Sequence, residues 1–127
     1  MDQLEKEVEL LQLLKKNMIE FFDELIEQFE EEGDLIVMRF FMAEQISLEM
    51  IMAHFIKYVY PLKDKIRNKD ESFFLEHDNI FGSSPKDKVI HFKQLYLRMN
   101  EDDRETLWAW FNCFISICDR YFKLKHS

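Results

Sequence analysis

The sequence predicts an all-α protein that folds as a single-domain bundle of about five helices. The chain of 127 residues contains only 2 Gly and 2 Pro, whereas strands and hairpins need turn residues at short intervals. Apolar residues make up 47% of the chain, and they recur at the spacing of helix faces. A chain of this length suits one hydrophobic core, so we expect one domain over residues 1–127.

The first predicted helix is acidic and covers about residues 3–32. Its apolar residues recur every three or four positions and therefore form one stripe. Gly33 is a suitable C-terminal stop, and Asp34 is a suitable cap for the next helix. The apolar positions follow a seven-residue repeat only in part, which is less than a coiled coil needs. Self-association of the chain through this helix stays open as an alternative.

The second predicted helix covers about residues 35–60 and ends at Pro61. Its apolar residues point in every direction at 100° per residue, which is typical of a helix at the centre of a bundle or in lipid. Charged residues such as Arg39, Glu44 and Lys57 interrupt it too often for a membrane span. We therefore expect a central helix of the bundle and no membrane partner.

A more broken segment follows over residues 61–82. Pro61 suits the first position of a short basic helix, and Asp70 or Ser72 is a candidate cap for the next turn. The apolar residues at 73–75 are expected to anchor this connection to the core.

Two capped helices are expected in the last third of the chain. Ser84 followed by Pro85 and Asp87 is a helix start, and Asn100 followed by three acids is another. The inner face expected for the earlier of these helices consists of Val89, Phe92, Leu95, Tyr96 and Met99.

The stretch over 105–122 is predicted to be an amphipathic helix, most of whose aromatic residues belong to the core. At 100° per residue, Trp110 falls on the inner side with Leu107, whereas Trp108 falls at the border of that face. Two interpretations of Trp108 follow. Its ring lies along the seam with a neighbouring helix, or it is an exposed anchor for a partner, a role in which Trp is enriched.

Cys113 and Cys118 lie five positions apart on the same predicted helix. Their side chains diverge by roughly 140°, so we expect two free thiols and no disulfide between them. Free thiols suit a reducing compartment. The start of the chain lacks the pattern of a secretory signal, and we therefore expect an intracellular protein.

The net charge of −8 is concentrated at the start of the chain. Residues 1–34 carry a balance of −9, and the remaining residues carry +1. An acidic chain is a poor candidate for sequence-specific nucleic-acid binding. The simpler interpretation is a solvated helix face, and the alternative is a docking surface for a basic partner. Self-association with the basic residues between Lys57 and Lys69 is also open. The candidate partner-binding residues are Glu20, Asp23, Glu24, Glu27, Glu30, Glu31 and Trp108.

No motif for chemistry is visible in the chain. The four His residues form neither Glu-x-x-His nor His-x-x-x-His pairs, and the cysteines lack Cys-x-x-Cys spacing, so no metal site is expected. His54 is expected to be a hydrogen-bonded core residue. Both glycines stand alone, which leaves no phosphate-binding loop. We therefore expect no cofactor and no enzyme activity.

The segments "PLKDKIRNKDESFFLEHDNIFG", "KVIHFKQLY" and "DDRETLWAWFNCFISICDRY", within residues 58–122, resemble small uncharacterised helical proteins of large cytoplasmic DNA viruses. The resemblance implies a virus-encoded protein of the host cytoplasm or the virion, and it implies no activity. The size and the apolar stretch are also similar to helical apoptosis regulators of the Bcl family, but their Asn-Trp-Gly-Arg motif is absent.

The function expected from the sequence is non-enzymatic. It is an interaction or structural module, such as a viral accessory protein or virion component. The first alternative is an acidic regulator or decoy that binds a basic, nucleic-acid-binding protein. The weaker alternatives are a Bcl-like regulator and an enzyme without a recognisable motif.

Overall fold

The computed structural model describes residues 2–77 and 91–126, and within them every regular element is helical. The predicted all-α fold class is therefore confirmed. Five of the described helices have seven or more residues. In chain order the elements are α1 (Gln3–Gln28), α2 (Gly33–Phe40), a π-helical turn (Phe41–Gln45), α3 (Leu48–Tyr58), a 3-10 turn (Tyr60–Leu62), α4 (Lys63–Arg67), α5 (Ser72–Glu76), α6 (Phe92–Arg98) and α7 (Glu101–Lys125).

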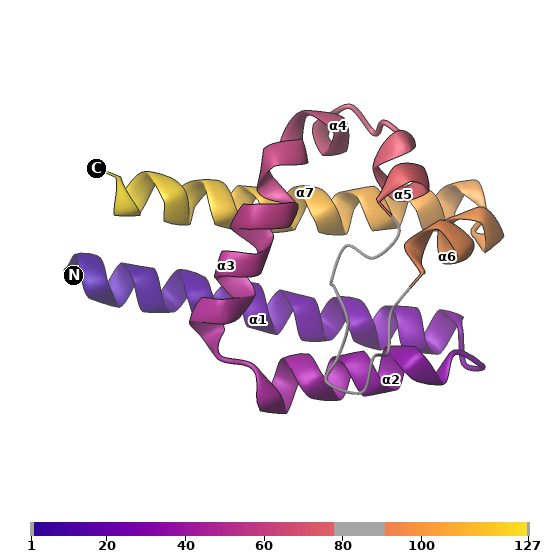
Figure 1. Cartoon of the computed structure of the whole chain (residues 1–127), viewed down its shortest axis with the longest axis horizontal. Helices are drawn as coiled ribbons and strands as arrows, with labels where there is room; N and C mark the ends of the chain where they lie inside the picture. Colours follow the sequence, from indigo (N-terminus) through magenta and orange to yellow (C-terminus); the bar gives the residue numbers. More distant parts are fainter. Residues whose placement is uncertain (1, 78–90, 127) are drawn as a thin grey trace.

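The two longest helices, α1 and α7, lie side by side and run in opposite directions, so both chain ends lie at one end of the molecule (Figure 1). Helix α2 lies along α1, and α3 crosses the pair. Helix α4 packs on α7, and α5 packs on α6 near the start of α7.

Both long helices begin at caps that the sequence encodes. Asp2 accepts the backbone N–H of Glu5 at 2.8 Å, and Asn100 accepts that of Asp103 at 2.8 Å. Each cap satisfies a backbone donor that would otherwise lack a partner in the first helical turn. The predicted cap at Asn100 is confirmed, whereas the predicted start at Ser84 lies outside the described residues.

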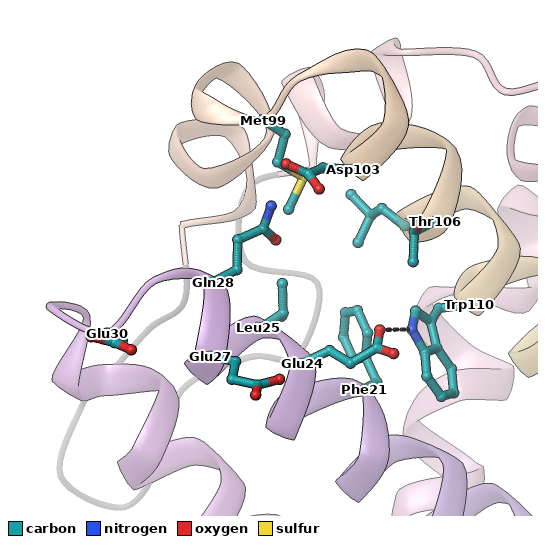
Figure 2. Close-up of a pocket in the computed structure, with 11 residues that line it drawn as sticks. Phe21, Glu24, Leu25, Glu27, Gln28, Glu30, Met99, Asp103, Thr106 and Trp110 are labelled. Carbon is teal, nitrogen blue, oxygen red and sulfur yellow. Dashed lines mark hydrogen bonds between the residues drawn. The ribbon is translucent and has the colours of Figure 1, made fainter.

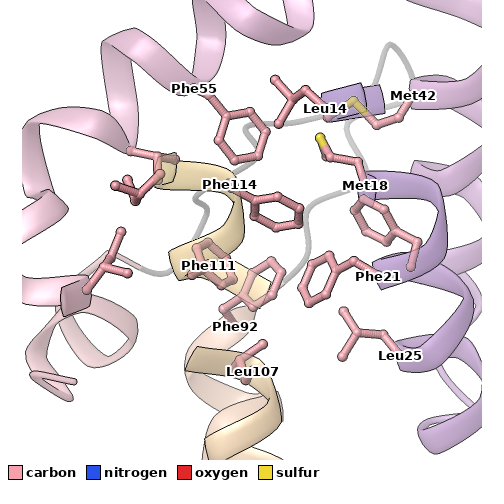
Figure 3. Packing of buried hydrophobic residues seen from close by; sticks show 14 of the residues in the cluster. Leu14, Met18, Phe21, Leu25, Met42, Phe55, Phe92, Leu107, Phe111 and Phe114 are labelled. Atoms are coloured by element: carbon pink, nitrogen blue, oxygen red, sulfur yellow. The ribbon is translucent and has the colours of Figure 1, made fainter. Parts of the chain in front are cut away.

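The core is rich in aromatic rings contributed by helices far apart in the sequence (Figure 3). The ring of Phe21 on α1 lies 5.7 Å from that of Phe111 and 5.5 Å from that of Phe114, both on α7. Phe92 of α6 stacks on Phe21 at 6.3 Å. Edge-to-face and offset aromatic pairs contribute about 0.5–1.5 kcal/mol each beyond the area they bury, so these contacts hold the α1–α7 pair together.

The predicted continuous helix over 35–60 is wrong. After the π-helical turn, Ile46 adopts an extended backbone, and the Ser47 hydroxyl caps α3 by accepting the N–H of Met50 at 3.2 Å. The stretch is also not buried all round, because Ile36 and Phe40 are 53% and 55% exposed. Helices α2 and α3 cover the outside of the α1–α7 pair, which occupies the central position instead.

The predicted boundary at Gly33 is also wrong. Helix α1 ends at Gln28, and Gly33 is the first residue of α2. Asp34 lies in the first turn of α2 and is not its cap. The connection is held by Phe29, whose ring is buried and lies 4.8 Å beneath the guanidinium of Arg98.

The segment after Pro61 follows the prediction only in part. Pro61 lies in the 3-10 turn, and the short basic helix α4 begins at Lys63. The N-cap residue of α5 is Glu71, without a side-chain hydrogen bond, so the predicted cap at Asp70 or Ser72 is wrong. Phe73 and Phe74 are fully buried, so they anchor this connection as expected. The carboxylate of Asp70 accepts the backbone N–H of Ser72 at 3.0 Å. The described members of the predicted inner face farther along the chain, from Phe92 to Met99, are buried as well.

Candidate interaction groove

A groove of about 650 Å³ lies between the second half of α1 and the first half of α7, beside the end of α6 (Figure 2). We call it the acidic groove. Its acidic residues are Glu24, Glu27, Glu30 and Asp103, its apolar residues are Phe21, Leu25, Met99, Leu107 and Trp110, and its remaining polar residues are Gln28 and Thr106.

The helical register of α1 explains why the acids and the apolar residues meet there. Phe21 and Leu25 face the core, whereas Glu24 and Glu27 lie beside them on the exposed flank of the same helix. Met99 comes from the end of α6, and the first turns of α7 supply the opposite wall. The groove therefore has a floor of core side chains and a rim of carboxylates.

The lining of the acidic groove contains four carboxylates and no Lys, Arg or His. Low-dielectric walls lined by one sign of charge focus the field and raise the local concentration of opposite charge. The stem of a long basic side chain can pack on apolar surface while its charged end stays beside water and carboxylates. The groove thus has the chemistry of a receptor for Lys or Arg side chains.

Trp110 is fixed in the wall by a hydrogen bond across the helix pair. Its indole N–H donates to Oε2 of Glu24 at 2.5 Å, and its half-buried ring stacks on Phe114 at 6.1 Å. This bond orients the Glu24 carboxylate and uses the single donor of the indole. The sequence placed Trp110 on the inner side of its helix but did not indicate a partner, because Glu24 lies 86 positions away.

The structure brings three of the predicted acidic residues into the groove and separates the others. Glu24, Glu27 and Glu30 line it. Asp23 instead accepts a hydrogen bond from Arg39 at 2.6 Å. Glu20 is exposed on another part of α1, outside the groove.

Glu31, the remaining predicted acidic residue, belongs to an ion pair within the protein. Arg98 donates to Glu31 and, at 2.8 Å, to Glu32. A backbone hydrogen bond, followed by the bond from Arg98, holds the pKa of Glu31 below its usual range. These carboxylates already have a cationic partner, so we exclude them from the acidic groove.

The basic residues between Lys57 and Lys69 do not neutralise the acidic segment within the described part of the chain. Lys65 donates to the hydroxyl of Ser72 at 3.0 Å, and Lys69 pairs with Glu105 at 2.5 Å. In the described residues, the cations that pair with carboxylates of residues 20–34 are Arg39 and Arg98.

Trp108 is not an exposed anchor. Its side chain is 3% exposed, and its ring lies 4.8 Å from that of Phe74 and 6.2 Å from that of Tyr96. The alternative interpretation, a ring in the seam between helices, is confirmed. The border position on the helix is buried because α5 and α6 cover this side of α7.

The two cysteines are free thiols in the structure, as expected. Burial raises the pKa of Cys118 to about 12. Burial and then the charge of Glu20 raise the pKa of Cys113, which is only partly buried. A nucleophilic or metal-binding cysteine needs a thiolate at neutral pH, so these environments oppose both roles.

Residues 2–77 and 91–126 contain no group of three His, Cys, Asp or Glu side chains arranged to hold a metal ion. In the same part of the chain, no helix combines the length and apolarity needed to cross a bilayer.

The chain matched no protein-family model, no curated protein and no solved structure in the comparisons made with them. The resemblance to viral proteins therefore stays a prediction from the sequence, and the feature of the structure that bears on function is the acidic groove.

Proposed function

We propose that this protein is a non-enzymatic interaction module whose acidic groove binds a basic segment of a partner protein. The observation that carries the proposal is the lining itself, in which four carboxylates surround an apolar floor without a basic residue. Charge complementarity then determines the occupant, which presents Lys or Arg on a segment that also carries apolar side chains.

The helix pair restricts the shape of the partner as well as its charge. Two antiparallel helices bound the groove on its long sides, and amphipathic helices commonly bind in grooves of this kind. We therefore expect the partner to dock a basic amphipathic helix. The decoy alternative uses the same groove and adds that this basic segment is one with which the partner binds nucleic acid.

The direct test is the binding of a labelled synthetic helical peptide with arginines on one face and leucines on the other, measured by fluorescence anisotropy. We expect saturable binding that weakens strongly between about 0.01 M and about 1 M salt, as the Debye length falls from about 30 Å to about 3 Å. The double reversal of Glu24→Lys and Glu27→Lys should abolish it.

The matched control is the double reversal of Glu9→Lys and Glu44→Lys, which changes the net charge equally at exposed positions outside the groove. It should bind the peptide nearly as well as the original protein. Thermal unfolding of both variants checks the fold. The control changes surface charges away from packed features and should change stability by about 0.5 kcal/mol or less. The groove variant also removes the acceptor of the Trp110 indole, so it should lose more stability and still unfold cooperatively.

Three results would contradict the proposal. The first is the absence of peptide binding, and the second is equal loss of binding in the two double reversals. The third is self-association of the protein at micromolar concentration that is lost in the groove variant, because a second copy would then be the occupant.

A further inference from the structure

Among residues 2–77 and 91–126, an aromatic side chain donates a hydrogen bond to a carboxylate of a distant element in three places. The Tyr60 hydroxyl donates to Asp119 at 2.7 Å, the Tyr96 hydroxyl donates to Glu71 at 3.0 Å, and the Trp110 indole donates to Glu24 at 2.5 Å. Each of these pairs places a negative charge beside the edge of an aromatic ring.

In two of the three places a cation completes the arrangement. Lys63 Nζ lies 4.4 Å from the ring centre of Tyr60. The Arg104 guanidinium lies 4.3 Å from that of Tyr96, with a terminal nitrogen 3.7 Å from the Glu71 carboxylate. The electron-rich ring face and the adjacent carboxylate both attract a cation. Arg104 reaches both at one position, whereas at Tyr60 the ring is covered by Lys63 and the Asp119 carboxylate pairs with Lys123 at 3.0 Å.

The third place lacks its cation within the described residues. No Lys or Arg of those residues is placed over the Trp110 ring or beside the Glu24 carboxylate. Trp binds cations better than Tyr or Phe does, and Trp110 faces an accessible groove that also carries Glu27 and Asp103 (Figure 2).

We infer that Trp110 and Glu24 form the anchoring subsite of the groove and that the partner supplies the missing cation, an arginine or lysine side chain seated over the Trp110 ring. This inference rests on the proposed function and identifies the contact on which that binding depends. Glu24 Oε2 accepts the indole N–H, which leaves Oε1 for the basic side chain. The indole has no donor left for a partner, so it can contribute only its ring.

The test uses protein labelled with ¹⁵N and two peptides. One is the basic amphipathic peptide described above, and the other has every arginine replaced by citrulline, which keeps the shape and removes the charge. Two indole N–H signals are expected, and the spectrum of Trp110→Phe assigns the one from Trp110. We expect the arginine peptide to shift this signal and the citrulline peptide to leave it unchanged.

Binding constants of variants test whether one cation contacts both residues. Glu24→Gln retains an acceptor for the indole and removes the charge, whereas Trp110→Leu removes the ring. Each should weaken binding by about two- to five-fold, and the double variant should weaken it by less than the product of the two. Glu44→Gln, outside the groove, is the control and should bind as the original protein does. If Trp110→Leu does not fold, Trp110→Phe replaces it in the cycle, with a smaller loss expected.

The possible failures separate the two claims. If the arginine peptide binds while the Trp110 indole signal stays in place, the subsite is refuted and the groove proposal stands. Unchanged peptide affinity of both single variants would likewise refute the subsite and leave the groove proposal standing. If the arginine peptide does not bind at all, both claims are refuted.

Discussion

Replacement of Trp108 by alanine distinguishes the two interpretations that the sequence left open. The side chain is 3% exposed and is surrounded by the rings of Phe73, Phe74 and Tyr96 at 4.8–6.5 Å. Burial of roughly 200 Å² of an aromatic side chain at about 25 cal/mol per Å² contributes about 5 kcal/mol. Measured losses for large aromatic-to-alanine substitutions in cores are about 3–5 kcal/mol, and we expect Trp108→Ala to fall in this range.

The assay is thermal and urea-induced unfolding followed by circular dichroism. For a chain of this size the expected loss lowers Tm by about 10–20 °C. Phe40→Ala is the control, because this aromatic side chain is 55% exposed and should cost about 1 kcal/mol or less. A Tm lowered by less than about 3 °C in Trp108→Ala, together with lost peptide binding, would refute the burial argument and restore Trp108 as an anchor.

Three further predictions concern the cap of α3, the thiols and the tyrosine–carboxylate pair. Ser47→Ala should cost about 1 kcal/mol in urea-induced unfolding, because α3 loses its N-terminal cap; an unchanged midpoint would contradict this. A thiol reagent at pH 8 should modify Cys113 slowly and Cys118 only after unfolding, since burial raises the pKa of Cys118 to about 12; two fast thiols in the folded protein would contradict it. Hydrogen bonding to Tyr60 and then to Lys123 lowers the pKa of Asp119, so this contribution to stability is present above about pH 4 and is lost as pH falls through the lowered value. Hydrogen bonding to Asp119 raises the pKa of Tyr60, so the same bond is lost as pH rises through a value above about 10. Tyr60→Phe should therefore reduce the dependence of the free energy of unfolding on pH at both the acidic and the alkaline end. An unchanged pH profile would contradict the pair.

The sequence predicted those features that depend on residues close together along the chain. The cap at Asn100, the burial near Phe73 and most of the inner faces of α1 and α7 follow from helical spacing, and the structure confirms them. The predicted apolar stripe of α1 is buried only from Leu11 onward, because Leu4 and Val8 at its start are 67% and 38% exposed. The spacing of 100° per residue also placed Trp108 at the border of the inner face of its helix. Whether a side chain at this border is buried depends on the packing of α5 and α6 against α7, which the spacing does not predict.

The break at Ser47 illustrates why the apolar stretch over 35–60 misled the prediction. An apolar run is compatible with one buried helix or with two helices that each bury one face. A serine within the run is a weak signal for a cap, and the π-helical turn before it has no sequence pattern that the spacing rules detect. The cost of breaking the helix is offset because α2 and α3 can then pack on different sides of the α1–α7 pair.

The acidic groove could be predicted only in part. The acidic run on the first helix was visible, and it contained Glu24 and Glu27. The contribution of Asp103 and Trp110 was not, because the antiparallel contact between α1 and α7 joins residues about 80 positions apart. The role of Arg98 as the internal partner of Glu31 was hidden for the same reason.

The most direct measurement of the central claim is a map of peptide binding on the protein by backbone amide chemical shifts. We expect the basic amphipathic peptide to shift amides of the second half of α1 and the first half of α7, around Glu24, Glu27 and Asp103, and to leave those of α3 and α4 unchanged. Shifts centred on another surface, or shifts of the same size with the citrulline peptide, would contradict it.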